Sequence, residues 1–219
     1  MRIAIMQPYF LPYAGYFRLL RDVDAFVVYD TVQFPRGGWV HRNRLRGRHG
    51  ASAWLTLPLA HAPLGTRIRD IGFHEHAQEL WRKRIRAFPA CSEPRGDAVP
   101  LAQDIAQLHG SPLDVISRSL RAAALLLGFE VPFVMASSLA IPGPLDRLGS
   151  LIAICRAFGA TEYLNAPGGR QLYDAQSFAR HGIALQFLPV YRGPADSVLQ
   201  RLHDEPAQAL RREIDANMT

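Results

Sequence analysis

The chain opens with the apolar run Arg2-Ile3-Ala4-Ile5-Met6, continues as Gln7-Pro8-Tyr9-Phe10-Leu11-Pro12-Tyr13-Ala14-Gly15-Tyr16-Phe17, and reaches a second apolar run, Ala25-Phe26-Val27-Val28-Tyr29-Asp30. This pattern predicts a short strand, a loop shaped by prolines, a helix over about 14–21 and a second strand. Such a succession begins an α/β unit. Open parallel sheets bind ligands at the carboxyl ends of their strands. Gln7, Tyr9, Tyr13, Tyr16 and Asp30 fall at that edge and are candidate ligand-binding residues.

The rest of the chain repeats the alternation of strand and helix. Strands at 2–6, 25–29, 132–135, 162–164 and 183–187 are predicted to share one sheet, and helices are predicted at 75–88, 111–127, 145–158, 175–181 and within 194–216. A further strand is expected at 53–58, and loops are expected at 60–72 and 89–100. We therefore expect a single α/β domain, 1–219, with a mainly parallel sheet covered by helices on both faces and a helical C-terminal part.

Composition narrows the class of partner. The chain has 219 residues, 48% of them hydrophobic, and a net charge of +6 in which Lys83 is the only lysine among 25 basic residues. Its basic residues form no dense run interleaved with aromatic residues, so a small anionic molecule is a better candidate ligand than a nucleic acid. Cys91 and Cys155 stand alone, without the spacing of a disulfide framework or zinc site. No signal peptide or transmembrane segment is apparent, and we expect a cytoplasmic protein.

The loop of residues 7–17 has two interpretations. In the structural one, the prolines shape a turn while Phe10 and Phe17 pack in the core. In the functional one, Gly15 lets the helix backbone approach a phosphate, and Tyr13 and Tyr16 offer hydroxyl groups. Tyr-x-Gly-Tyr also occupies the place where nucleotidyltransferases such as pantothenate synthetase carry His-x-Gly-His. Tyrosine, with a pKa near 10, cannot supply the cation that histidine supplies.

Two further polar segments are candidates for the same site. Arg42 and Arg44 have the spacing that puts them on one face of a strand; they form either a solvated basic hairpin or, as we favour, a clamp for phosphate or carboxylate. Asn165, Gly168, Gly169 and Arg170 follow another strand, where glycine exposes backbone amides to an anion. Asp174 is a candidate helix cap, and Ser137-Ser138 either completes the pocket or forms a turn. His74 and His76 have no third ligand at a metal-binding spacing, so no metal site is expected.

Several of these motifs resemble the WbqC-like family along nearly the whole chain and in the same order. The resemblance is carried by Met6–Tyr13 with Gly15-Tyr16-Phe17, by Tyr29-Asp30-x-Val-Gln33, by Gly38-Trp39 with Asn43-Arg44, and by Gly159-Ala160-Thr161-x-Tyr163-Leu164-x-x-Pro167-Gly168-Gly169. Family members occur in bacterial surface-polysaccharide gene clusters, and some are suggested to add glycine to an O-antigen sugar. By position, the shared polar residues are Gln7, Tyr9, Tyr13, Asp30, Gln33, Asn43, Arg44, Gly168 and Gly169. This chain departs from the family pattern at Pro89–Pro100 and at Asn165-Ala166; a different substrate follows if that segment lines the acceptor pocket.

The resemblance and the motifs together imply a transferase or amide-forming ligase that joins an amino acid, such as glycine, to an amino sugar. An amide bond requires an activated carboxylate, so we expect ATP with Mg²⁺ as the cofactor. The catalytic candidates are Gln7, Tyr13, Asp30 and Arg44. The candidates for binding substrate or nucleotide are Tyr9, Gly15, Tyr16, Gln33, Arg42, Asn43, Asn165, Gly168, Gly169 and Arg170.

Two alternatives stay open at this point. A transferase could use a preformed nucleotide sugar or acyl thioester and need no ATP. A non-catalytic protein of the same pathway could bind a nucleotide sugar, since the sequence contains no evident pair of nucleophile and base.

Overall fold

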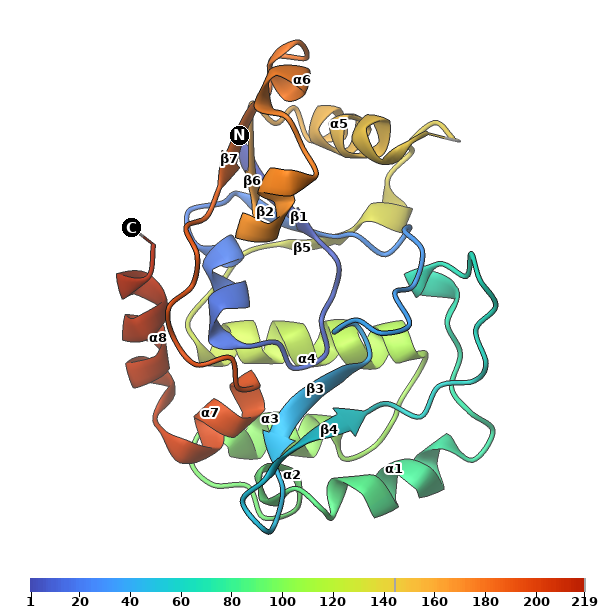
Figure 1. Cartoon of the computed structure of the whole chain (residues 1–219), viewed down its shortest axis with the longest axis vertical. Helices are drawn as coiled ribbons and strands as arrows, with labels where there is room; N and C mark the ends of the chain where they lie inside the picture. The colour runs from blue at the N-terminus through green and yellow to red at the C-terminus, as the bar shows by residue number, and fades with distance from the viewer. Residues whose placement is uncertain (144, 219) are drawn as a thin grey trace.

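A five-stranded parallel sheet organises the molecule. The computed structural model describes residues 1–143 and 145–218, and orders the strands of this sheet β5-β2-β1-β6-β7 (Figure 1). The strands are β1 (Arg2–Met6), β2 (Ala25–Val28), β5 (Phe133–Met135), β6 (Glu162–Asn165) and β7 (Ala184–Phe187), and every neighbouring pair is parallel. The predicted sheet is therefore confirmed, including the membership of all five strands.

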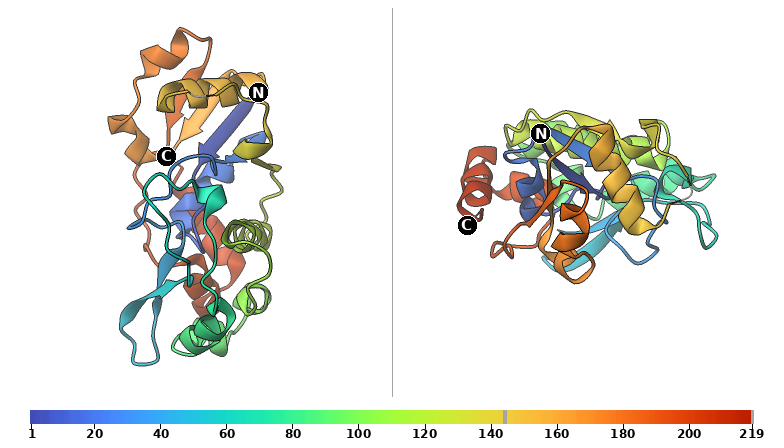
Figure 2. Two further views of the ribbon diagram at one scale, coloured as in Figure 1. Left: turned by 90° about the vertical axis from the view of Figure 1, so that its right-hand side faces the viewer. Right: turned by 90° about the horizontal axis from the view of Figure 1, so that it is seen from above.

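Helices cover both faces of the sheet because successive strand residues point to opposite sides. On β1, Ile3 and Ile5 pack with α5 (Arg147–Ala157) and α6 (Ala175–Ala179), whereas Ala4 packs on the other side with η1 (Ala14–Leu20) and α4 (Pro112–Leu126). Figures 1 and 2 show the sheet between these two layers. The predicted α/β fold is confirmed, although residues 14–20 form a 3₁₀ helix rather than an α-helix.

A hairpin and a group of helices complete the larger core. The strand expected at 53–58 is observed as β4 (Ser52–Thr56), but it pairs antiparallel with β3 (Arg42–Arg46) and does not join the sheet. The remaining elements are η2 (Ile68–Asp70), α1 (Ala77–Ile85), α2 (Pro89–Ser92), α3 (Ala98–Ile105), η3 (Ala136–Ser138), η4 (Pro167–Gln171), α7 (Val198–Asp204) and α8 (Ala207–Ala216). The C-terminal part is thus helical, as predicted.

The prediction of a surface loop at 89–100 is wrong, because this segment contains α2 and the beginning of α3. Its prolines do not prevent helix formation. Pro89 occupies the first turn of α2 and Pro100 the first turn of α3, where a missing N–H costs no helical hydrogen bond. Ala90 and Ala98 are fully buried, so burial of small apolar side chains outweighs the loop-like composition.

The order of the strands creates a crevice at one edge of the sheet. From β1 the chain crosses through η1 to β2, and from β6 it crosses through α6 to β7 on the opposite side. Because β1 and β6 are neighbours, the connections that leave their carboxyl ends diverge there. This is the topological switch point at which open α/β sheets bind ligands. Separately, none of the helices in the described residues is long and apolar enough to cross a membrane.

Candidate functional site

A pocket of about 890 Å³ opens at this switch point, and we call it the carboxyl-edge pocket. Its volume lies within the range of small-molecule sites, roughly 300–1,000 Å³. The pocket is formed by residues that follow β1, β2 and β6, by the start of α5 and by η4. It is lined by Ile5, Met6, Gln7, Tyr9, Tyr29, Thr31, Val32, Gln33, Leu145, Asp146, Arg147, Ser150, Leu151, Tyr163, Asn165, Ala166, Gly168, Gly169, Leu172 and Tyr173.

The first wall of the pocket comes from the loop after β1. The buried Tyr16 hydroxyl donates a hydrogen bond of 2.8 Å to the carbonyl of Gln7, and its ring lies 5.2 Å from that of Tyr9. Tyr16 thus positions Gln7 and Tyr9, two predicted residues of this loop that line the pocket. Gln33, also predicted from the sequence, contributes to the wall that follows β2.

The opposite wall is built where β6 ends, and glycine is required there for a steric reason. The Asn165 Oδ1 accepts a hydrogen bond of 2.7 Å from the Ala166 N–H. A Cβ atom on Gly169 would lie 2.5 Å from Asn165 Nδ2 and 3.0 Å from the Phe187 ring, whereas a Cβ on Gly168 would meet open space. Gly169 therefore permits close packing on Asn165, while Gly168 leaves part of the wall open.

The charge in the pocket comes from the first turn of α5. Asp146 caps this helix, and its Oδ1 accepts a hydrogen bond of 2.7 Å from the Gly149 N–H. The next residue, Arg147, is the one cationic side chain among the described residues that line the pocket. The Asp146 carboxylate at the same end is already bound to the start of the helix, so Arg147 is the group that can attract an anionic group of a ligand.

Tyrosine side chains supply neutral hydrogen-bond donors. Burial, together with the smaller effect of the nearby Tyr13, raises the pKa of Tyr9 to about 12. Burial also raises the pKa of Tyr29, against the effect of a hydrogen bond with Ser150, and raises that of Tyr173, against the charge of Arg147. These phenols are consequently protonated at neutral pH, so they can donate hydrogen bonds to a ligand but do not act as bases.

Several residues predicted from the first loop are packed inside the protein instead. Gly15 is buried, and a side chain there would collide with the rings of Tyr13 and Tyr191. Tyr13 lies 5.5 Å from Tyr191, between ring centroids, and Tyr16 is 3% exposed. Neither Gly15 nor the Tyr16 hydroxyl is accessible to a phosphate in this arrangement. The structural interpretation of Phe10 and Phe17 as core residues is confirmed.

Asp30 and Asn43 are buried side chains that bind the backbone rather than line the pocket. Asp30 Oδ1 accepts a hydrogen bond of 2.9 Å from the Ser137 N–H, which ties the end of β2 to η3. Asn43 Nδ2 donates to the carbonyls of Phe10 and Leu11 at 3.2 and 2.6 Å. Each therefore positions a loop next to the pocket.

Three predicted arginines also lie outside the carboxyl-edge pocket. Arg42 and Arg44 do share one face of β3, but both stack on Trp54. Arg170 donates a hydrogen bond of 3.3 Å to the Phe187 carbonyl and lies over the ring of that residue. Of the predicted residues, the pocket therefore brings together Gln7, Tyr9, Gln33, Asn165, Gly168 and Gly169.

Sequence reasoning missed the polar residues Tyr29, Thr31, Asp146, Arg147, Ser150 and Tyr173 as members of the site. Two signals could have pointed to them. Tyr29 and Thr31 flank the predicted Asp30, and neighbouring residues alternate in direction at the end of a strand. Asp146 is a typical helix cap, and a helix that follows a parallel strand begins near the carboxyl edge of the sheet.

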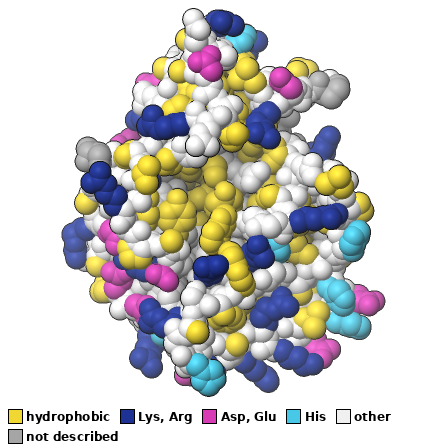
Figure 3. All heavy atoms as spheres, viewed as in Figure 1, with side chains coloured by type: hydrophobic (Ala, Val, Ile, Leu, Met, Phe, Trp, Pro, Cys, Tyr) yellow, Lys and Arg dark blue, Asp and Glu magenta, His cyan; other side chains and the backbone are white. Residues whose placement is uncertain are grey.

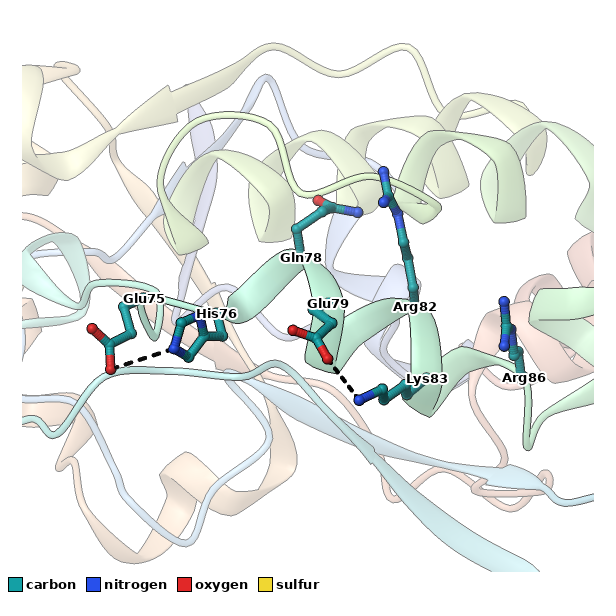
Figure 4. A pocket seen from close by; sticks show the side chains of 7 residues that line it. All are labelled: Glu75, His76, Gln78, Glu79, Arg82, Lys83 and Arg86. Atoms are coloured by element: carbon teal, nitrogen blue, oxygen red, sulfur yellow. Dashed lines mark hydrogen bonds and ion pairs between the residues drawn. The ribbon is translucent and has the colours of Figure 1, made fainter.

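A second hollow, of about 470 Å³, lies along α1 and is drawn in Figure 4. Lys83 Nζ lies 2.6 Å from Glu79, and His76 lies 3.8 Å from Glu75. The lining residues all fall within 75–86, on α1 and the residues next to it, and none follows a strand of the parallel sheet. Within the described residues, no group of three or more His, Cys, Asp or Glu side chains is arranged to hold a metal ion. The carboxyl-edge pocket is thus the better candidate site.

Comparison with known proteins gives one family and one relative. The model of the WbqC-like protein family matches residues 7–195. An uncharacterized protein of Mycobacterium tuberculosis (strain ATCC 25618 / H37Rv), Rv1507c, is 27% identical over 224 residues, which cover 95% of each chain. No solved structure shows significant similarity to this chain. The matched residues include both walls of the carboxyl-edge pocket.

Proposed function

We propose that this chain, which belongs to the WbqC-like protein family, is a transferase of surface-polysaccharide biosynthesis. The proposed reaction attaches an amino acid, such as glycine, to an amino sugar of an O-antigen. The carboxyl-edge pocket binds the small anionic substrate of this reaction, and Arg147 contacts its carboxylate or phosphate.

One observation carries the proposal: a pocket of about 890 Å³ lies at the switch point of the sheet, and among its described lining residues Arg147 is the only arginine, next to the capping carboxylate of Asp146 and among phenol and amide groups. The planar guanidinium suits a carboxylate or phosphate, since it can donate two parallel hydrogen bonds. The amides of Gln7 and Asn165 and the hydroxyl of Tyr29 can bind the polar groups of a sugar or a nucleoside. Together these groups match a nucleotide, a nucleotide sugar or an activated amino acid.

Amide formation needs a good leaving group on the carboxyl carbon. With ATP and Mg²⁺, the amino acid carboxylate would attack the α-phosphorus and release pyrophosphate; the sugar amine would then attack the carboxyl carbon, release AMP and lose a proton. Because Gly15 and Tyr16 are buried, Arg147 is the group that would contact the nucleotide phosphate. A preformed nucleotide-sugar or acyl-thioester donor would fit the same pocket without ATP.

Binding experiments test the site directly. Calorimetric titrations with ATP and Mg²⁺, UDP, UDP-N-acetylglucosamine and glycine should detect a ligand whose affinity falls about tenfold or more in Arg147→Ala, because a charge-assisted hydrogen bond is typically worth about 1.5–3 kcal/mol. Arg95→Ala is the matched control: Arg95 is exposed in the turn between α2 and α3, far from α5 in Figure 1. Equal affinity in the wild type and Arg147→Ala would refute the site.

Turnover assays then distinguish the alternatives. Release of pyrophosphate that depends on both ATP and an amino acid supports carboxylate activation. Transfer from a nucleotide sugar or acyl thioester without ATP supports the preformed donor. Tight binding with no turnover of any donor supports a non-catalytic binding protein.

A further inference from the structure

The β3–β4 hairpin and the turn before it carry two tryptophans, the exposed Trp39 and the half-buried Trp54, and two arginines that do not line the carboxyl-edge pocket. Trp39, Arg42, Arg44 and Trp54 form this cluster, which we call the Trp–Arg surface. The ring centroids of Trp39 and Trp54 lie 5.1 Å apart, and the guanidinium carbons of Arg42 and Arg44 lie 4.3 and 4.8 Å from the centre of the Trp54 ring. Trp39 is 39% exposed, so an aromatic face is open to solvent.

Strand register and the preceding turn hold this surface in place. Arg44 lies opposite Trp54, and Arg42 lies two residues away on the same face. The carbonyl of Trp39 accepts a hydrogen bond of 3.1 Å from the Phe10 N–H. A Cβ atom on Gly38 would lie 2.9 Å from the Pro35 ring, so the turn before Trp39 is closely packed. The surface is therefore preorganised rather than part of a loose loop.

The charges on the hairpin are divided into paired and unpaired ones. Arg46 lies 2.9 Å from Asp204, and Arg48 lies 2.7 Å from Glu93. Arg42 and Arg44 have no carboxylate within ion-pair distance among the described residues, and Arg42 Nε is buried without a hydrogen-bond partner. Arg42 Nη2 donates a hydrogen bond of 2.7 Å to the Gly37 carbonyl, which holds the side chain in place but does not neutralise its charge. Two positive charges without a carboxylate partner thus lie next to an exposed indole.

We propose that the Trp–Arg surface is a second binding site, for an anionic saccharide. The apolar C–H face of a pyranose ring packs on the Trp39 indole, while a carboxylate or phosphate on the sugar contacts Arg42 and Arg44. The choice of a saccharide rests on the proposed function; the need for an anion and a stacking ring rests on the hairpin itself. In that function, this surface holds the sugar polymer while the pocket holds the small substrate.

A saccharide fits these observations better than a single-stranded nucleic acid. Sites for single strands need a positive groove that follows several phosphates, with aromatic residues along it. In Figure 3, Lys and Arg side chains are spread over the lower half of the face that contains the hairpin, around a band of hydrophobic side chains. On the hairpin itself, however, ion pairs neutralise Arg46 and Arg48, which confines the free charge to two residues.

Tryptophan fluorescence tests the proposal on the full chain. The chain has three tryptophans, and Trp81 is fully buried with its Nε1 donating a hydrogen bond of 2.6 Å to the Ile105 carbonyl. Trp39 and Trp54 therefore report on ligands at the surface. Hexagalacturonate should change the fluorescence saturably, with an affinity that falls as salt rises. Arg44→Ala should weaken this binding about tenfold or more, and Trp39→Phe should remove most of the signal change.

The matched control is Arg46→Ala, which removes the same charge from the same strand face but from a paired arginine. The affinity of Arg46→Ala for hexagalacturonate should stay within about twofold of the wild-type affinity. Thermal melts should show Arg44→Ala folded, since exposed arginines contribute little stability. Three results would overturn the proposal. They are no saturable change in fluorescence, binding of neutral maltohexaose as tight as that of hexagalacturonate, and an equal loss of affinity in Arg44→Ala and Arg46→Ala. Tighter binding of the oligonucleotide dT12 would instead identify a nucleic-acid site and also overturn it.

Failure of this inference and failure of the proposed function can be told apart. Arg147→Ala should weaken ligand binding in the pocket about tenfold or more and leave hexagalacturonate binding unchanged. Arg44→Ala should do the reverse. If either folded variant loses both ligand binding in the pocket and hexagalacturonate binding, the two sites are not separate.

Discussion

At the scale of single residues, Leu11 shows how the first loop is held. Its φ of 48° lies in the left-handed region, although leucine favours other conformations, and its side chain is fully buried. The Leu11 carbonyl accepts hydrogen bonds of 2.6 Å from Asn43 Nδ2 and 2.8 Å from Ser197 Oγ. Two distant parts of the chain therefore keep the loop in this conformation.

Asn43→Ala should lower the free energy of unfolding by about 1–3 kcal/mol, because it removes a buried donor from the carbonyls of Phe10 and Leu11. Urea denaturation at neutral pH would measure this loss. Gln208→Ala, on an exposed position of α8, should change stability little. If the two variants are equally stable, Asn43 does not hold the loop.

His41 should make stability depend on pH. Burial, together with the smaller effect of the Arg42 charge, lowers the pKa of His41 to about 4 in the folded protein. Unfolded histidine titrates near 6.5, so between these values the unfolded chain binds a proton that the folded chain does not. Stability should be complete above pH 6.5 and fall by about 1–3 kcal/mol as the pH drops to about 4, since partial exposure reduces the effect.

Urea denaturation at pH 7, 5.5 and 4.5 would show this decline. His41→Gln should reduce the slope between pH 7 and 4.5, whereas His109→Gln, at an exposed position, should retain it. Identical slopes in both variants would contradict the role of His41.

At the scale of elements, one buried arginine joins the C-terminal helix to the start of the chain. Arg18 in η1 is fully buried and donates hydrogen bonds to three carbonyls: Gly15 at 3.2 Å, Asn217 at 2.6 Å and Pro189 at 3.0 Å. Its guanidinium also lies 5.2 Å from the centre of the Tyr191 ring. A rigid fork with several N–H donors satisfies these separated acceptors better than a single ammonium group.

Arg18→Met should therefore destabilise the protein by about 2–4 kcal/mol, because it leaves buried carbonyls without donors. Arg18→Lys should recover only part of this loss. Differential scanning calorimetry of both variants would measure the effect, with Arg212→Met on the exposed face of α8 as the control. A variant Arg18→Met as stable as this control would show that the three hydrogen bonds contribute no net stability.

At the scale of the whole molecule, the sheet separates two cores, and each joins residues that are far apart in the sequence. Ile3, Ile5 and Tyr163 belong to the core under α5 and α6, while the larger core on the other face includes residues as distant in sequence as Phe10, Leu45 and Leu210. Local patterns therefore say little about the larger core. The carboxyl-edge pocket lies where the two halves of the sheet meet.

The sequence by itself determined the five strands, their parallel arrangement and the candidate pocket residues Gln7, Tyr9 and Asn165. Apolar runs of strand length, separated by helical segments, require parallel crossovers, and the residues after each strand fall at one edge of the sheet. The helix expected at 111–127 is observed as α4, whose start is held by an equally local contact, the capping box of Ser111 and Asp114. These features depend on neighbours along the chain, which sequence patterns record.

Only the tertiary structure decided which polar side chains share the pocket. Arg44 in the middle of β3 and Arg147 at the start of α5 are both exposed arginines, yet one stacks on Trp54 and the other lines the pocket. The difference arises from strand order and from the packing of the hairpin against the first loop, which are long-range contacts. Periodicity specifies the face of an element but not the partner that covers it, so the direction of a polar side chain follows from the assembled fold.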